Sequence, residues 1–328
     1  MPAMKKIVVV GLGAVGGFIA ARLARAGHAV HALARGATLA AVQRGGLTLT
    51  EGGRTERYAV AATDDAAAIG PADLLVIALK SPALAQMARS LAPLVNTQTL
   101  VLPAMNGVPW WFLRVPPCND TKPLAAVDPD GAIAATLPTE RTLGCVVHLT
   151  CSMPAPGEVR HGFGQRLIVG EATGSASARC KAVAGLLESG GFSVEQSADV
   201  RRDIWYKLWG NMTMNPVSAL TASSCDAILD DDLLRAFMAR AMGEAAAIGA
   251  RIGCPIEQRA EARMALTREL GAFKTSMLQD AESGRPLELD ALVGAVREIG
   301  ARVGVPTPEI DTLFGLTRLM ARKRGLYG

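Results

Sequence analysis

The sequence predicts an α/β domain built on a doubly wound parallel sheet, followed by an all-α domain. Strand-like apolar runs alternate with helical segments in the first part of the chain, and from residue 198 onward the pattern is helical throughout. A length of 328 residues also suits two cores better than one. We therefore expect domains at residues 1–197 and 198–328.

The first domain begins with a short run at residues 6–10 that is β-branched from Ile7 onward, which is typical of a buried strand. A glycine-rich turn and a helix to about Ala26 follow, and Gly27 ends that helix. Further strands, with helical segments between them, are expected at 29–34, 73–79 and 99–102. Strands alternating with helices predict a parallel sheet.

The pattern changes between residues 146 and 170, where short strand-like pieces surround a turn at 154–157. Residues 158–161 and 166–169 are expected to form hairpin strands, and residues 192–194 one more strand.

The charge pattern argues against large charged partners. The 34 basic and 30 acidic residues are mixed along the chain and leave a net charge of +4. No basic block indicates nucleic-acid or membrane binding, while a small positive excess suits an anionic small molecule. No apolar run is long enough to span a bilayer. Glycines interrupt the apolar stretch 7–21, as a strand and turn require and a secretion signal does not, so we expect a cytoplasmic protein.

Metal binding is not expected. The six cysteines lack the two-residue spacing of zinc or redox sites, and the four histidines do not cluster with acids or cysteines. We interpret the cysteines as reduced thiols.

The glycine-rich turn indicates a dinucleotide cofactor. It reads Gly11-Leu12-Gly13-Ala14-Val15-Gly16. Because this turn follows a strand and opens a helix, the glycines would let the backbone approach a pyrophosphate, and the helix N-terminus would supply free N–H groups.

The end of the second strand bears on which cofactor binds. An acid there would bond the ribose hydroxyl of NADH, but this chain has Arg35. An arginine can form charge-assisted hydrogen bonds with a 2′-phosphate, which favours NADPH. The alternative is that Arg35 is a solvated surface residue.

Polar side chains also mark a candidate catalytic site. Lys80 and Asn106 each follow a buried strand, at the sheet edge where doubly wound folds bind ligands. Lys207, Asn211 and Asn215 are spaced i, i+4, i+8 and would share one face of a helix. Because the rest of the segment is apolar, this polar stripe indicates a functional site and not a solvated surface. Pro216 is expected to bend this helix.

Together these motifs resemble the ketopantoate reductase (2-dehydropantoate 2-reductase) family along essentially the whole chain. The ordered set is the glycine turn, Leu79-Lys80, Asn106-Gly107, Lys207-x-x-x-Asn211-x-x-x-Asn215-Pro216, and Ser276 with Glu288 twelve residues later. The resemblance implies a Rossmann-type NADP-binding domain, a helical substrate domain, and reduction of ketopantoate to pantoate for pantothenate and coenzyme A biosynthesis.

The resemblance also implies a role for each residue. Lys207 would be the general acid: hydride addition leaves negative charge on the keto oxygen, which an ammonium stabilises and then protonates. Asn211 and Asn215 would hold the hydroxyl and carboxylate end of the substrate, and Ser276 would bind its carboxylate. Asn106 would touch both substrate and cofactor. Lys80 and Glu288 would contact the cofactor. A helical second domain of this size also offers surfaces for a homodimer.

Two positions depart from the family pattern. Where members that make pantoate often carry asparagine three residues before the serine, this chain has Phe273, and where they often carry Asn-Gly it has Cys225-Asp226. The hydride chemistry is therefore better supported than the identity of the keto acid.

Two other functions remain open. The first is a 3-hydroxy acid or imine reductase on the same plan, although residues 200–203 lack the glycine-rich stretch that precedes the lysine of such enzymes. The second is an NADPH-sensing regulator, which would not need Lys207, Asn211, Asn215 and Glu288 as a set.

Overall fold

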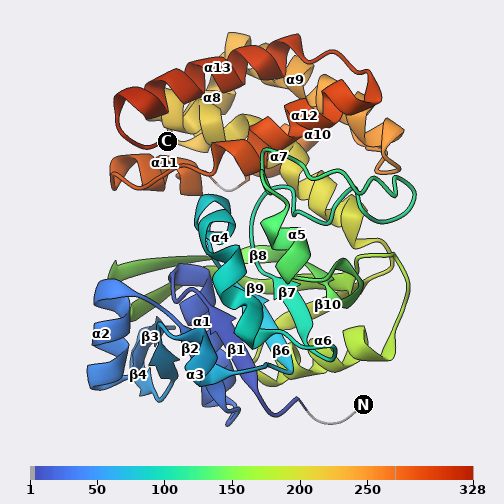
Figure 1. Cartoon of the computed structure of the whole chain (residues 1–328). Helices are drawn as coiled ribbons and strands as arrows, with labels where there is room; N and C mark the ends of the chain where they lie inside the picture. The colour runs from blue at the N-terminus through green and yellow to red at the C-terminus, as the bar shows by residue number, and fades with distance from the viewer. Residues whose placement is uncertain (1–3, 270, 328) are drawn as a thin grey trace. The chain divides into compact units, whose positions relative to one another are not determined.

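The computed structural model describes residues 4–269 and 271–327 and divides the chain into two compact units (Figure 1). The first unit comprises residues up to Met105 together with Gly131–Asp203, and the second comprises Asn106–Asp130 and the residues from Ile204 onward. The expected division at 197/198 differs from these units in two respects: the later boundary lies after Asp203, and the segment Asn106–Asp130 packs with the helical unit.

A five-stranded parallel sheet forms the centre of the first unit. Its strands are β1 (Ile7–Val10), β2 (Val30–Leu33), β5 (Ala61–Thr63), β6 (Leu74–Ile77) and β7 (Leu100–Pro103), in the order β5-β2-β1-β6-β7. Every residue of β1, β6 and β7 is buried, which explains their uninterrupted apolar runs. The four strands expected from the sequence are confirmed, and β5 is an addition.

Helix α1 (Ala14–Arg25) packs between this sheet and a second one, and buries Phe18, Ile19 and Leu23. The other helical elements of the unit are α2 (Gly36–Gly45), α3 (Ala66–Ile69), α4 (Ser81–Met87), η1 (Ala88–Leu94), α5 (Ala132–Thr136), η2 (Thr139–Arg141) and α6 (Ala178–Ser189).

The second sheet corrects one sequence expectation. It orders β10 (Ser193–Ser197), β9 (Glu158–Glu171), β3 (Leu47–Glu51) and β4 (Arg54–Tyr58), and β8 (Leu143–Ala155) pairs with β9. Residues 158–161 and 166–169, expected to face each other in a hairpin, lie in the single strand β9. Between the two expected strands the pairing is only disturbed: Gly164 has a φ of +75°, and the register with β8 shifts between His148 and Thr150.

A buried ion pair fastens the end of β9 to α6. The side chain of Glu171 is 2% exposed and accepts hydrogen bonds from Arg179 Nε at 2.8 Å and Nη2 at 2.6 Å. Ser177, the N-cap of α6, also donates to Glu171. Burial alone would raise the pKa of this carboxyl, but the bonds from Arg179 and Ser177 outweigh it, and the pKa is lowered.

We expect Glu171→Gln to lower the free energy of unfolding by about 2 kcal/mol at pH 7, because it removes a buried charged hydrogen-bond acceptor. A carboxyl with a lowered folded pKa stabilises the fold above its unfolded pKa and loses that effect as the pH falls through the folded pKa. The difference in free energy of unfolding between Glu171→Gln and wild type should therefore shrink below about pH 4.

Urea unfolding at pH 7 and pH 3.5 measures this difference. Glu195→Gln is the control, since Glu195 pairs with Arg166 on the surface with both side chains 52% exposed. Equal effects at the two positions would contradict the prediction.

The second unit is helical, as the sequence predicts. Its elements are α7 (Val200–Thr221), α8 (Cys225–Asp230), α9 (Asp232–Arg251), α10 (Ala260–Arg268), α11 (Ser276–Glu282), the π-helix η3 (Asp290–Gly294), α12 (Ala295–Val303) and α13 (Pro308–Lys323). Helix α7 is fixed to α9 by two buried indoles: Trp205 donates to the carbonyl of Ala245 and Trp209 to that of Met242. In the described part of the chain, no helix is both long and apolar enough to cross a membrane.

The segment Asn106–Asp130 belongs to this unit through polar anchors and one aromatic contact. The Glu298 carboxylate accepts the backbone N–H groups of Ala125 and Ala126 at 3.0 and 2.9 Å. The ring of Phe112 stacks on Trp205, with centroids 5.9 Å apart. These contacts join residues nearly a hundred or more positions apart, which explains why local sequence patterns did not reveal them.

Candidate active site

The glycine turn of the first unit combines crowded positions with one open position. A Cβ atom at residue 16 would lie 2.0 Å from the Gly11 carbonyl oxygen, and one at residue 11 would lie 2.8 Å from the Ala78 oxygen. At Gly13, the N-cap of α1, a Cβ would meet no atom within 4 Å. Gly11 and Gly16 therefore close the turn itself, whereas the space beside Gly13, before the helix N-terminus, is open.

A cavity of about 170 Å³ extends from this turn to the end of β2. It is lined by Gly11, Leu12, Gly13, Leu33, Ala34, Arg35, Thr38, Leu79, Met87 and Met153. Arg35 is exposed, occupies the N-cap position of α2, and lies with Nη2 3.5 Å from the sulfur of Met87. The sequence indicated the glycines and Arg35; it gave no signal for Met87 or Met153, which reach the cavity from α4 and β8.

Lys80 is placed as expected, at the carboxyl end of β6. It is the N-cap of α4, and its neighbour Leu79 lines the cavity. Backbone hydrogen bonds from the Gly11 N–H to the Leu33 carbonyl and from the Ala78 N–H to the Val10 carbonyl continue the ladder just past the strand ends. The residues following β1, β2 and β6 thus share one edge of the sheet.

In the second unit, the structure brings Lys207 and Asn106 together. The Lys207 ammonium donates a hydrogen bond to Asn106 Oδ1 at 2.8 Å, across a hundred and one positions of sequence. Lys207 and Asn106 are both partly buried. A lysine ammonium has three donor hydrogens, so this bond orients the group and leaves two for other partners.

Helix α7 carries the polar stripe that the spacing predicts. It is continuous from Val200 to Thr221, so Lys207, Asn211 and Asn215 follow one another at single-turn intervals on one face. Asn215 is 5% exposed and Asn211 partly buried. The helix continues past Pro216 to its end at Thr221.

The loop after Asn106 is held by η3. Gly107 has a φ of +85°, and a Cβ there would lie 2.6 Å from the Ala291 carbonyl oxygen. The next residue, Val108, donates its N–H to the same oxygen at 3.0 Å. Local sequence patterns indicate Asn106-Gly107 but give no signal for the turn on which it docks.

Glu288 and Ser276 both lie at helix starts. Glu288 directly precedes the helical run from Leu289, and its carbonyl accepts the N–H of Leu292, so it stands at the helix N-terminus rather than within the first turn. Ser276 is exposed and is the first residue of α11, after the N-cap Thr275.

The two positions that depart from the family pattern touch each other. The Cys225 N–H donates to the Phe273 carbonyl at 2.9 Å. The Cys225 side chain is buried, and burial, with a further contribution from Asp226, raises the pKa of the thiol to about 11. This sulfur therefore remains an uncharged, largely apolar group at neutral pH.

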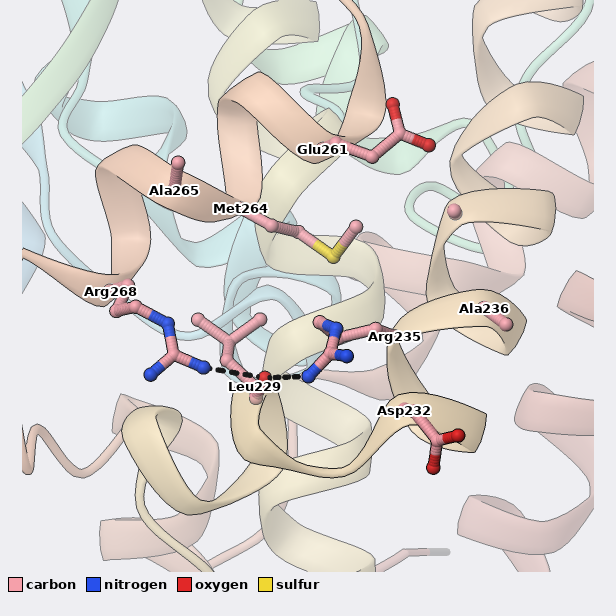
Figure 2. A pocket seen from close by; sticks show the side chains of 9 residues that line it. Leu229, Asp232, Arg235, Ala236, Glu261, Met264, Ala265 and Arg268 are labelled. Atoms are coloured by element: carbon pink, nitrogen blue, oxygen red, sulfur yellow. Dashed lines mark hydrogen bonds between the residues drawn. The ribbon is translucent and has the colours of Figure 1, made fainter.

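Another cavity, of about 420 Å³, lies among α8, α9 and α10 and is lined by none of the predicted site residues (Figure 2). Arg235 and Arg268 both donate to the Leu229 carbonyl there, at 2.6 and 2.7 Å. Residues 4–269 and 271–327 contain no group of three His, Cys, Asp or Glu side chains that could hold a metal ion.

Comparison with known proteins matches both parts of the chain. The family model for ketopantoate reductase PanE/ApbA matches residues 7–174, and the model for the C-terminal part of the same family matches residues 199–321. A 2-dehydropantoate 2-reductase from Mesorhizobium japonicum is 42% identical over 325 residues, which cover 98% of this chain and 99% of the relative.

Solved structures agree with the predicted fold class. A candidate ketopantoate reductase from Ralstonia solanacearum is 58% identical with a TM-score of 0.96, and the match covers 99% of this chain and 100% of that chain. A D-mandelate dehydrogenase solved with NADH has a TM-score of 0.85 at 20% identity, covering 98% and 99% of the two chains, and shares the fold alone.

Proposed function

Because this chain belongs to the ketopantoate reductase family and is an oxidoreductase of that kind, we propose that it uses NADPH to reduce a 2-keto acid to a 2-hydroxy acid. The first candidate reaction is ketopantoate to pantoate, a step toward pantothenate and coenzyme A. The observation that carries the proposal is the Lys207 ammonium held on Asn106 Oδ1.

The chemistry assigned to Lys207 follows from where charge develops. When bound, the reduced nicotinamide supplies a hydride to the keto carbon. Lys207 stabilises the negative charge that then forms on the substrate oxygen, and delivers a proton to it from Nζ. Asn106 holds the ammonium in place by accepting one of its hydrogens.

The remaining site residues are assigned to binding. Asn211 and Asn215 provide amides for the substrate from the same helix face as Lys207. Ser276 provides a hydroxyl for the carboxylate. Lys80 and Glu288, together with Asn106, are assigned to the cofactor.

The first unit fits a dinucleotide at the glycine turn. The open position at Gly13 leaves room for a pyrophosphate against the N-terminus of α1, and the cavity beyond it ends at Arg35. A guanidinium there suits the 2′-phosphate that distinguishes NADPH from NADH.

Replacing Arg35 by alanine should weaken NADPH binding by about tenfold to a hundredfold, because charged hydrogen bonds contribute roughly 1.5–3 kcal/mol. The affinity for NADH should change by less than about threefold, since its ribose presents no charge for the guanidinium. Fluorescence titration of both cofactors measures this. Arg44→Ala is the control, because Arg44 lies in the last turn of the same helix. Equal losses for the two cofactors would make Arg35 a bystander.

A second candidate substrate class is favoured by the contact between Cys225 and Phe273. Both side chains are apolar where pantoate-forming relatives often carry amides, and the thiol stays uncharged. A substrate site without amides at these two positions suits a 2-keto acid with a hydrocarbon side chain better than one with a terminal hydroxyl.

The deciding experiment is an NADPH-oxidation assay with a panel of 2-keto acids that includes ketopantoate and branched or aromatic keto acids. The highest kcat/KM for ketopantoate supports the first candidate, and an apolar keto acid in its place supports the second. NADPH binding with no turnover of any keto acid would overturn the proposed reaction and favour a sensing role.

We also propose that the protein forms a homodimer. A ketopantoate reductase from Staphylococcus aureus is described as dimeric, and that protein shares this fold at 18% identity. Sedimentation velocity at micromolar concentration tests it, and a single species near 34.2 kDa would contradict it.

A further inference from the structure

A π-helical turn begins at Asp290, two residues after Glu288. In η3 (Asp290–Gly294) the carbonyl of Asp290 accepts the N–H of Ala295, five residues later instead of four. Such a turn inserts one extra residue into a helix and changes where its carbonyl groups are directed, and π turns are frequent at functional sites. Here it lies at the start of the helical run, after Leu289, and the run continues as α12.

The residues after Asn106, Gly107 and Val108, pack against the backbone of this turn. The Ala291 carbonyl, inside the turn, accepts the Val108 N–H at 3.0 Å. Gly107 lies flat against the same residue, since a Cβ there would be 2.6 Å from the carbonyl oxygen and 2.8 Å from both the carbonyl carbon and the Cβ of Ala291. Only glycine allows this approach at a φ of +85°.

We propose that the π turn is a positioning device for the catalytic lysine. The turn holds Gly107 and Val108 through the Ala291 carbonyl, and these two residues set the position of Asn106. Asn106 Oδ1 in turn holds the Lys207 ammonium by accepting its hydrogen bond. Gly107 and Ala291 are positioning residues, because neither is assigned a contact with the reacting atoms. The consequence for catalysis rests on the proposed function, but the placement of Asn106 can be tested without any turnover.

Leu326 and Tyr327, near the C-terminus, also hold the π turn in place. The Tyr327 hydroxyl donates to Asp290 Oδ1 at 2.7 Å, and the Leu287 N–H donates to the Leu326 carbonyl at 2.9 Å. Gly294 makes room for the Asp290 carboxylate, because a Cβ at residue 294 would lie 3.1 Å from Oδ1. Tyr327 thus supports the turn that supports Asn106.

The direct test follows the Asn106 side-chain amide by NMR. The chain has only five asparagines, so selective ¹⁵N-asparagine labelling gives five side-chain NH₂ signals, and Asn106→Asp identifies the one that belongs to residue 106. In Gly107→Ala this signal should move in the same direction as in Lys207→Ala, which removes the hydrogen-bond donor. We also expect kcat to fall at least about fiftyfold, a loss within the range for a displaced acid catalyst.

Gly304→Ala is the matched control. Gly304 has a φ of +71°, close to that of Gly107, but a Cβ there meets no atom within 4 Å. It therefore introduces the same backbone strain in the same unit without the contact with the π turn. In this variant the Asn106 signal and kcat should stay at wild-type values.

An unmoved Asn106 signal in Gly107→Ala, or equal kcat values for the two glycine variants, would overturn the proposal. If Gly107→Ala does not fold, Tyr327→Phe replaces it, with Tyr58→Phe of the other unit as control. An Asn106 signal that shifts only in Tyr327→Phe supports the device, and one that does not shift overturns it. If no keto acid is reduced by the wild type, the NMR result alone decides.

Discussion

Lys207→Ala is expected to lower kcat by about 10³-fold or more, since general acid catalysis and charge stabilisation contribute roughly 10²–10⁴-fold and 10²–10³-fold in comparable enzymes. The alanine leaves no group that can neutralise the substrate oxygen or donate a proton to it. NADPH binding should remain within about threefold of wild type, because the glycine turn and Arg35 lie in the other unit.

Steady-state NADPH oxidation and fluorescence titration of the cofactor measure the two quantities. Lys274→Ala is the control: Lys274 is half-exposed on the same unit and pairs with Glu282 at 2.7 Å. Retained turnover in Lys207→Ala would remove the lysine from its assigned role. A parallel loss of NADPH binding would show that the substitution disturbs more than the chemical step.

The second large effect is expected from two substitutions in the glycine turn. Gly16→Ala should mainly destabilise the fold, whereas Gly13→Ala should mainly weaken NADPH binding. Gly16→Ala should lower the free energy of unfolding by about 3 kcal/mol or more, because its Cβ would lie 2.0 Å from the Gly11 oxygen and the turn must open. Gly13→Ala should cost less than about 1 kcal/mol, because its Cβ enters open space and its φ is an ordinary −73°.

For NADPH the consequence of Gly13→Ala should be severe. The added methyl would occupy the space left for the pyrophosphate, and we expect the dissociation constant to rise at least about a hundredfold. Thermal unfolding with and without NADPH separates the two effects. The prediction fails if Gly13→Ala still gains the wild-type increase in Tm on adding NADPH.

Local sequence patterns predicted most of the fold because most elements show a recognisable pattern within a few residues. The apolar runs of β1 and β6 are continuous since both faces of these strands are covered, and the glycines around α1 are required by close contacts. The short strands β3, β4 and β5 were missed because most of their residues are exposed or only partly buried and they carry no such run. The two halves of β9 were separated in the prediction because glycine marks bulges as well as turns.

The candidate site was predictable only as far as its residues sit in recognisable spacings. The stripe on α7 could be placed from its four-residue period, and Arg35 from its position after a strand. The hydrogen bond between Lys207 and Asn106 and the docking of Gly107 on Ala291 depend on contacts far apart in sequence. The π turn gave no signal, because one extra residue in a helix leaves the apolar pattern almost unchanged.

The assignment of Asn106–Asp130 to the helical unit limits how the two units can be exchanged by recombination during evolution. The chain passes from one unit to the other after Met105, after Asp130 and again after Asp203. A recombination event at a single point therefore cannot exchange one unit intact: a crossover near residue 197 would join a helical unit to a foreign Phe112 and foreign partners for Glu298. Such chimeras should be stable only between parents that match at these contacts, so the two units are expected to evolve as a pair.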